Sequence, residues 1–138
     1  MTKIILALLA YSVGASPVIA QTKTVTANQS IERGKLVYQQ LCLTCHQGNG
    51  GGVPNMNPPL IKSPWVSGDK KKLINIVLIG FSEKVAINGA CYSNNMPSQA
   101  TLTDQQIADV LSYVRVNFGN IASAIMPKDV LEQRKMIK

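Results

Sequence analysis

The sequence predicts an all-α fold in which three or four helices and one small β-hairpin form a single domain. Apolar residues recur at the three- and four-residue spacing of amphipathic helices in three segments, 31–46, 70–79 and 104–118. Residues 47–64 are rich in glycine and proline and follow no helical spacing, so they predict a long irregular loop. Asn88-Gly89 is a dipeptide that favours a tight turn between two β-strands.

The first helix is expected to begin at Ile31, after a polar arm over residues 21–29. Ser30 is a suitable N-cap because its hydroxyl can accept a hydrogen bond from a free backbone amide of the first turn. Gly34 costs the helix roughly 1 kcal/mol of propensity relative to alanine. A glycine at this place is either simply tolerated or allows another helix to cross closely.

A second helix is predicted from Lys70 to Ile79, preceded by Ser67-Gly68-Asp69 and ended by Gly80. Its first turn carries three consecutive lysines, residues 70–72, where the helix dipole disfavours positive charge. Such a run is usually a solvated surface. Because positive charge at this end of a helix lowers its stability, the run is also a candidate for docking an acidic partner.

Residues 84–93 are predicted to form the hairpin, with its turn at Asn88-Gly89. In the register that this turn imposes, four side chains share one face: Val85, Ile87, Ala90 and Tyr92. Cys91 falls on the other face. It is either a small packed side chain or the source of a disulfide between two copies. We expect a monomer, and a dimer linked through Cys91 is the alternative.

Thr103 and Gln106 form a capping-box pattern that predicts the start of the last main helix. The helix is expected to continue through Phe118 and to end at Gly119, and Pro127 predicts a further short helix. One domain is therefore expected over residues 21–138, with a core of about 30–119 and a tail over 120–138.

The run Cys42-Leu-Thr-Cys45-His46 is the most informative motif of the chain. The pattern C-x-x-C-H is the attachment signature of c-type haem. Two thiols three residues apart lie on one face of a helical turn, where each can add to one vinyl group of the porphyrin. The histidine that follows is then placed to bind the iron. The sequence predicts one haem c, attached through Cys42 and Cys45.

Other uses of this motif fit the rest of the sequence less well. A structural zinc site needs four protein ligands, usually in two paired clusters, and here it would have to use the one histidine and all three cysteines without forming a second pair. A thioredoxin-like redox pair calls for alternating strands and helices around the motif, which the sequence lacks. A disulfide between Cys42 and Cys45 leaves His46 unexplained.

The second axial ligand cannot be a histidine of this chain, because the chain has only one. A methionine thioether is a suitable soft donor, and the candidates after residue 20 are Met56, Met96, Met126 and Met136. Met96 lies in an irregular stretch between hairpin and last helix, and Pro97 restricts its backbone. We predict Met96 as the ligand, with a packed methionine and an open iron site as the alternative.

The first twenty residues have the features of a secretory signal. Lys3 precedes an apolar stretch over 4–13 that is too short to span a bilayer, and cleavage after Ala20 would deliver the protein to the periplasm. An uncleaved membrane anchor is the alternative. No other segment of the sequence is expected to span a membrane.

The chain carries a formal net charge of +7. This charge favours an acidic redox protein as partner, or loose attraction to an anionic membrane surface. Basic and aromatic residues are not interleaved, which argues against nucleic acid as a partner.

Further residues accompany the haem motif, namely Gly34, Tyr38, Gly50, Gly52, Pro58-Pro59-Leu60, Met96-Pro97 and the segment 109–120. With them the chain resembles the class I bacterial c-type cytochromes over about residues 30–119. It is also similar to small cytochrome partners or subunits of periplasmic dehydrogenases and nitrite reductases. The resemblance implies a cytochrome c fold around one haem, with Gly34 and Tyr38 meeting the last main helix.

The resemblance also implies roles for single residues. His46 and Met96 would be the axial pair, and the carbonyl of Pro58 would accept a hydrogen bond from the other ring nitrogen of His46. Leu60 would pack on the porphyrin. Trp65 would donate its indole N–H to a haem propionate, or would be an ordinary packed aromatic.

An axial pair of histidine and methionine closes both faces of the iron and raises its reduction potential. We therefore expect a carrier that passes single electrons between redox proteins and is not itself an enzyme. A dedicated subunit of a periplasmic dehydrogenase or reductase is the second hypothesis, with the tail as its contact. A haem sensor or catalyst with an open iron site is the third.

Overall fold

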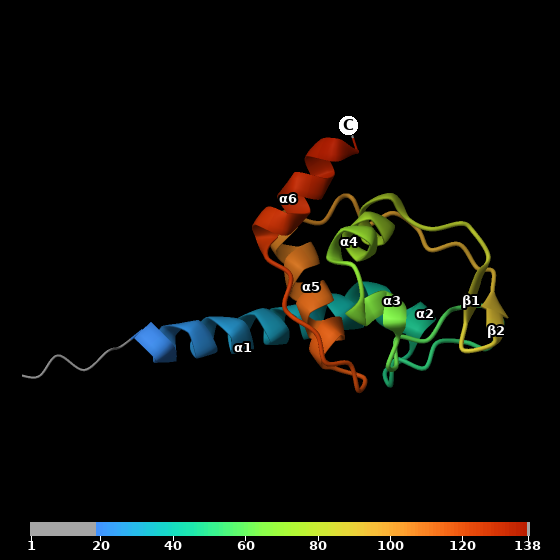
Figure 1. Ribbon diagram of the computed structural model, residues 1–138, viewed down its shortest axis with the longest axis horizontal. Helices are drawn as coiled ribbons and strands as arrows, with labels where there is room; N and C mark the ends of the chain where they lie inside the picture. Colours follow the sequence, from blue (N-terminus) through green and yellow to red (C-terminus); the bar gives the residue numbers. More distant parts are fainter. Residues whose placement is uncertain (1–18, 138) are drawn as a thin grey trace, which may run out of the picture.

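The computed structural model describes residues 19–137, with side chains from residue 27 onward. The predicted signal over 1–20 therefore lies almost wholly outside the described residues. The fold is mostly helical with one two-stranded antiparallel sheet, which confirms the predicted class (Figure 1). In chain order the elements are α1 (Ile19–Val37), a π-helical turn η1 (Tyr38–Cys42), α2 (Leu43–His46), α3 (Pro64–Ser67), α4 (Lys70–Ile79), β1 (Val85–Ile87), β2 (Ala90–Tyr92), α5 (Asp104–Val116) and α6 (Pro127–Met136).

Helix α1 begins earlier than the sequence indicated. The prediction of a polar arm over 21–29 is wrong, because these residues are helical and Ser30 lies inside the helix instead of capping it. The Ser30 hydroxyl donates a hydrogen bond to the buried carboxylate of Asp109 in α5, and Arg33 binds the same carboxylate through Nε at 2.6 Å. The hydroxyl that could have capped a helix is used for packing between helices instead.

Helices α1 and α5 cross closely (Figure 1), and the glycine contacts place Gly34 at the crossing. A Cβ atom added there would lie 2.0 Å from the carbonyl oxygen of Asp109 and 2.9 Å from the Cβ of Tyr113. One turn further along, the rings of Tyr38 and Tyr113 pack with their centroids 5.5 Å apart. The close crossing explains the glycine, and Tyr38 meets the last main helix as the resemblance implied.

Helix α4 has the predicted bounds. The side chain of Asp69 caps it by accepting hydrogen bonds from the backbone amides of Lys71 and Lys72 at 2.7 and 3.3 Å. Gly80 follows the last turn with φ of 81°. The buried face of α4 joins the main core cluster through four side chains: Leu73, Ile74, Val77 and Leu78.

The hairpin has the predicted register, with Val85 opposite Tyr92, Ala86 opposite Cys91 and Ile87 opposite Ala90. Cys91 is exposed, as expected of the outward face. The hairpin lies at the end of the molecule away from the start of α1 (Figure 1).

The capping box of Thr103 and Gln106 is present at the start of α5. The helix ends at Val116, two residues before the predicted end, and Phe118 adopts a left-handed backbone with φ of 55°. Helix α6 packs against α4 and α5, so the tail is part of the described fold. Among the described helices, none has both the length and the apolar character needed to cross a membrane.

Candidate functional site

The haem motif begins at Cys42, the last residue of a widened helical turn. In η1, the backbone amide of Leu43 bonds to the carbonyl of Tyr38, five residues earlier. Turns of this kind are frequent at functional sites. Helix α2 contains the rest of the motif, and the chain leaves the helix at Gln47, where φ is 65°. The phenol of Tyr38 donates to the Gln47 carbonyl at 2.6 Å, so a buried side chain fixes the end of this turn.

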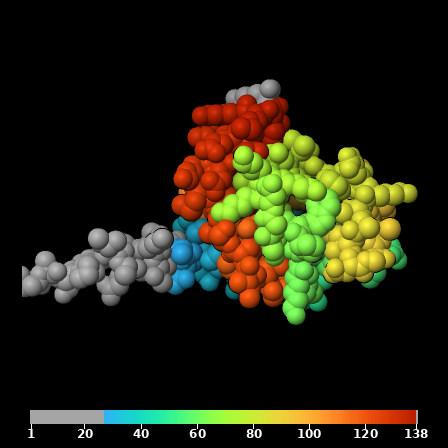
Figure 2. Space-filling view, viewed as in Figure 1, coloured from blue at the N-terminus to red at the C-terminus, as the bar shows by residue number. Residues whose placement is uncertain are grey.

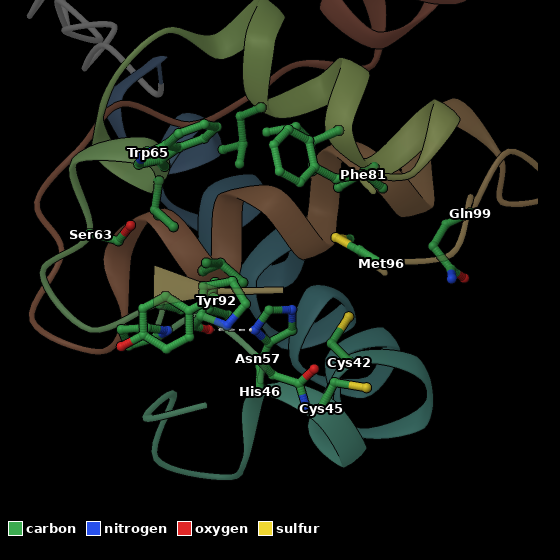
Figure 3. A pocket seen from close by; sticks show the side chains of 18 of the residues that line it. Cys42, Cys45, His46, Asn57, Ser63, Trp65, Phe81, Tyr92, Met96 and Gln99 are labelled. Atoms are coloured by element: carbon green, nitrogen blue, oxygen red, sulfur yellow. Dashed lines mark hydrogen bonds between the residues drawn. The ribbon is translucent and has the colours of Figure 1, made fainter. Parts of the chain in front are cut away.

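His46 makes the hydrogen bond that the resemblance implied. Its Nδ1 lies 3.0 Å from the carbonyl oxygen of Pro58, drawn as a dashed line in Figure 3. A carbonyl can only accept, so Nδ1 carries the proton and Nε2 is left with a free lone pair for a metal ion. Burial lowers the pKa of His46, against the opposite effect of the bond to Pro58. The net lowering of the pKa favours the neutral imidazole, and the bond to Pro58 selects the tautomer that carries its proton on Nδ1.

The two thiols of the motif lie beside His46 at the rim of one cavity (Figure 3). Cys42 is half-buried and Cys45 is exposed. Burial, and then the neighbouring Cys45, raise the pKa of the Cys42 thiol to about 11. Both thiols line the cavity, so both are placed to reach a porphyrin bound in it.

Met96 reaches the same cavity from the opposite side (Figure 3). Its backbone forms a two-way bridge with Phe81, with N···O distances of 2.8 and 2.9 Å. Gly80 lets this loop approach, because a Cβ atom there would lie 2.5 Å from the Met96 carbonyl oxygen. The other described methionines, Met56, Met126 and Met136, are 49, 52 and 72% exposed and do not line the cavity.

The cavity between His46 and Met96 is walled mainly by apolar side chains. They come from the 58–66 segment, α4, the hairpin and α5, and include Leu60, Val66, Leu73, Val77, Val85, Ile87, Val110, Leu111 and Val114. A nitrogen donor on one side, a thioether on the other and two thiols at the rim suit a large, flat, apolar metal complex. The residues present therefore fit haem c.

Trp65 also lines the cavity, and its ring is covered from outside by Lys72, whose Nζ lies 3.8 Å from the ring centroid. Phe81 meets the same ring edge-on at 5.7 Å between centroids. Lys70 points elsewhere, because its Nζ donates to the carbonyl of Ala124. The lysine run is therefore not a single patch: successive residues of a helix face different directions.

Some residues of the site were not identified from the sequence. The pattern placed the side chains of Val85, Ile87 and Tyr92 on one face of the hairpin, and the structure shows that this face covers the cavity. The phenol of Tyr38 gave no signal of its own, because its partner is a backbone carbonyl. Within residues 19–137, no three His, Cys, Asp or Glu side chains gather as a metal cluster would require.

The family description for cytochrome c matches residues 31–117, well over half of the chain. The chain belongs to the cytochrome c family. This cytochrome c carries haem c, attached through Cys42 and Cys45 of its C-x-x-C-H motif.

Similar proteins include a small cytochrome and cytochrome c subunits of dehydrogenases. Cytochrome c-552 of Thermus thermophilus is 29% identical over 126 residues, covering 75% of this chain and 95% of its own. The gluconate 2-dehydrogenase cytochrome c subunit of Pantoea cypripedii is 33% identical over 82% of this chain, but over only 26% of its own length. The cytochrome c subunit of the quinone alcohol dehydrogenase of Gluconacetobacter polyoxogenes is 33% identical over 79% of this chain and 24% of its own length. The chain thus spans about a quarter of these dehydrogenase subunits.

Proposed function

We propose that this cytochrome c is a periplasmic electron carrier that passes single electrons between redox proteins. The observation that carries the proposal is the opposed placement of His46 and Met96 across one apolar cavity. When bound, haem supplies one-electron chemistry through its iron. The protein's own residues decide what else can reach that iron.

His46 and Met96 are the proposed axial ligands. The bond to Pro58 holds the His46 ring with Nε2 toward the cavity, and the bridge to Phe81 holds the Met96 backbone. With His46 and Met96 both bound to the iron, small molecules would have no free coordination site. This arrangement favours electron transfer over catalysis at the metal.

The cavity wall has a second proposed role. Leu60 and the other apolar side chains keep water from the metal, and a low-dielectric shell disfavours the more highly charged oxidised state. Trp65 is the proposed donor to a haem propionate through its indole N–H. Neither role involves bond making by the protein.

Partners are proposed from charge. Lys71, Lys72 and Lys84 are exposed, and a positive surface steers an acidic redox protein toward brief contact. The basic, apolar character of residues 1–20 supports export to the periplasm. We propose that residues 21–138 then form one domain.

A second candidate is a dedicated subunit of a dehydrogenase or reductase complex. The similarity to the cytochrome c subunits of gluconate 2-dehydrogenase and alcohol dehydrogenase supports it. The contact would be the outer face of α6, where Lys128, Leu131 and Glu132 are exposed. Purification from the native host with a large flavin- or quinone-dependent partner would favour this candidate over a free carrier.

The test is a spectroscopic redox titration of the exported protein, with mass spectrometry of the same sample. We expect the mass of the polypeptide plus one haem, one reversible one-electron transition, and the ferric absorption band of methionine-ligated haem. The reduced protein should not bind carbon monoxide rapidly at neutral pH. A mass equal to that of bare polypeptide, or rapid stoichiometric binding of carbon monoxide, would refute the closed-site carrier.

A further inference from the structure

One side of the cavity is formed by a segment with little regular structure of its own. This wall segment, residues 60–68, includes the short helix α3 and contributes Leu60, Ser63, Trp65 and Val66 to the cavity lining. Buried backbone groups need hydrogen-bond partners. For the wall segment, many of those partners are side chains of one region, the second half of α5 and the residues just after it. In Figure 2 these two parts of the chain, coloured green and orange, lie side by side.

Asn120 holds the beginning of the wall segment. Its side-chain amide donates to the carbonyl of Leu60 at 2.8 Å and to the carbonyl of Val114 at 2.9 Å. Its carbonyl oxygen accepts from the backbone amide of Ser63 at 3.0 Å. Asn120 is only 4% exposed, so these bonds do not compete with bulk water.

Arg115 holds the end of the wall segment. Its Nη1 donates to the carbonyl of Val66 at 2.6 Å and to that of Gly68 at 3.2 Å, and its Nε donates to the carbonyl of Ser123 at 2.8 Å. The side chain is 3% exposed, and its partners in the described part of the chain are backbone carbonyls. Arginine is suited to this task because its planar fork presents several donors at fixed angles.

Between these two attachments lie Trp65 and Val66, which face the cavity. A loop fixed at both ends by buried side chains has little freedom to move away from what it covers. The end of α5 therefore determines how closely the wall approaches the haem, although neither Arg115 nor Asn120 is among the residues that line the cavity.

We propose that Arg115 and Asn120 are positioning residues that hold the wall segment against the haem, and that they thereby set its exposure to water and its reduction potential. The inference rests on the proposed function of the site. Loosening either attachment should let the wall retract and admit water near the iron. Water stabilises the more highly charged oxidised state, so the midpoint potential should fall.

The protein contains a built-in reporter for this movement, because Trp65 is its only tryptophan. In the holoprotein the nearby haem quenches tryptophan emission, and retraction of the wall should increase it. Arg115→Lys keeps the positive charge but removes the planar guanidinium group with its several donors. We expect higher Trp65 emission and a lower midpoint potential than in the wild type, with haem attachment unchanged by mass.

Arg134→Lys is the matched control. Arg134 has a comparable fork that binds Asp104 and the carbonyls of Ala100 and Leu102, each at 2.8 Å, and it does not touch the wall segment. This variant should lose thermal stability like Arg115→Lys but keep the wild-type emission and potential. If Arg115→Lys lowers only the melting temperature and leaves both readouts at wild-type values, Arg115 is merely structural and the proposal fails.

Asn120→Asp supplies a second test if Arg115→Lys does not accumulate as holoprotein. It removes the two amide donations while keeping the shape of the side chain. Asn117→Asp is its control, because the Asn117 amide donates to the carbonyl of Tyr113 within its own helix end. The proposal is supported if Trp65 emission and the midpoint potential change in Asn120→Asp but not in Asn117→Asp. Equal values in the two variants refute it. A wild-type protein without haem would instead refute the proposed function, before any variant is compared.

Discussion

The Nδ1 atom of His46 lies 3.0 Å from the carbonyl oxygen of Pro58, twelve residues later. The loop between them is closed by Gly52, whose amide donates to the carbonyl of His46 at 3.0 Å. Gly52 has a left-handed backbone with φ of 66°, and a Cβ atom there would lie 2.3 Å from the Asn57 carbonyl oxygen and 2.8 Å from that of Pro58. The position of the histidine ring thus depends on the absence of a side chain at residue 52.

Gly52→Ala should therefore disturb both stability and the haem site. The left-handed backbone alone costs about 1 kcal/mol with a Cβ atom, and the overlap with Asn57 and Pro58 adds to it. We expect a lower free energy of unfolding and an altered Soret spectrum. Gly89→Ala is the control, because Gly89 is also left-handed but a Cβ atom there meets nothing within 4 Å. Equal losses and unchanged spectra in both variants would contradict a special role for Gly52.

Met96→Ala should open the sixth coordination position of the haem. The reduction potential should fall because the thioether donor is lost, and the reduced variant should bind carbon monoxide rapidly. Both can be followed by absorbance during a redox titration and after mixing with the gas. Met56→Ala, at a methionine outside the cavity, should change neither. Failure of Met96→Ala to change either property would rule out Met96 as the ligand.

Gly34→Ala should separate α1 from α5. A Cβ atom 2.0 Å from the Asp109 carbonyl cannot be accommodated without moving one helix, and overpacking of this kind costs about 2 kcal/mol or more. Chemical denaturation of the holoprotein measures the loss. Gly48→Ala should change stability by less than about 0.5 kcal/mol, because a Cβ atom there meets nothing within 4 Å. A stable Gly34→Ala protein would contradict the close crossing.

Tyr38→Phe should lower stability by about 1 kcal/mol at neutral pH, because the 2.6 Å bond to Gln47 is lost. Burial, and to a smaller extent Tyr113, hold the pKa of Tyr38 well above its ordinary value. The stability that comes from keeping this phenol neutral is complete below about pH 10, where a free tyrosine begins to ionise. It is lost as the pH rises further toward the pKa of the folded protein. The free energy of unfolding, measured from pH 8 to 11, should fall more steeply in the wild type than in Tyr38→Phe. Parallel curves would show that the pKa of Tyr38 is not raised in the folded protein.

Thiol counting tests the attachment chemistry. The chain has three cysteines, two of which carry the haem, so only the exposed Cys91 should remain as a free thiol. Alkylation of the denatured, reduced holoprotein should add one group per chain, and none in Cys91→Ser. Three groups on the wild type would mean that the thioether bonds had not formed. Electrophoresis of the same samples without reductant would reveal any dimer linked through Cys91.

Elements that depend on neighbouring residues were predictable from the sequence. Asp69 and Gly80 bound α4, Asn88-Gly89 sets the hairpin register, and Thr103 caps α5, each through local hydrogen bonds or backbone preference. The haem motif was recognised for the same reason, since its spacing is visible in a short stretch. Met96 was predicted as the ligand from the softness of its thioether and its place in the chain, and the structure puts it in the cavity lining. These features needed no knowledge of the rest of the fold.

Features that depend on distant residues were not predictable in this way. Ser30 looked like a helix cap, but its hydroxyl bonds to Asp109, which is 79 residues away. The lysine run looked like one surface, but Lys70 bonds to the carbonyl of Ala124 and Lys72 covers Trp65. Every residue has a backbone carbonyl, so the sequence does not show which carbonyl will accept a hydrogen bond from a distant side chain. Such contacts can be identified only in the folded structure.

The widened turn at Tyr38–Cys42 links two parts of one continuous helix that serve different purposes. Before the turn, Gly34 must face α5, and from its last residue onward Cys42 and Cys45 must face the porphyrin. Each residue of an α-helix rotates the chain by about 100°, so removing one residue from this turn would swing both cysteines out of line with the crossing. Natural or engineered variants should therefore tolerate substitutions in this turn much better than a change in its length.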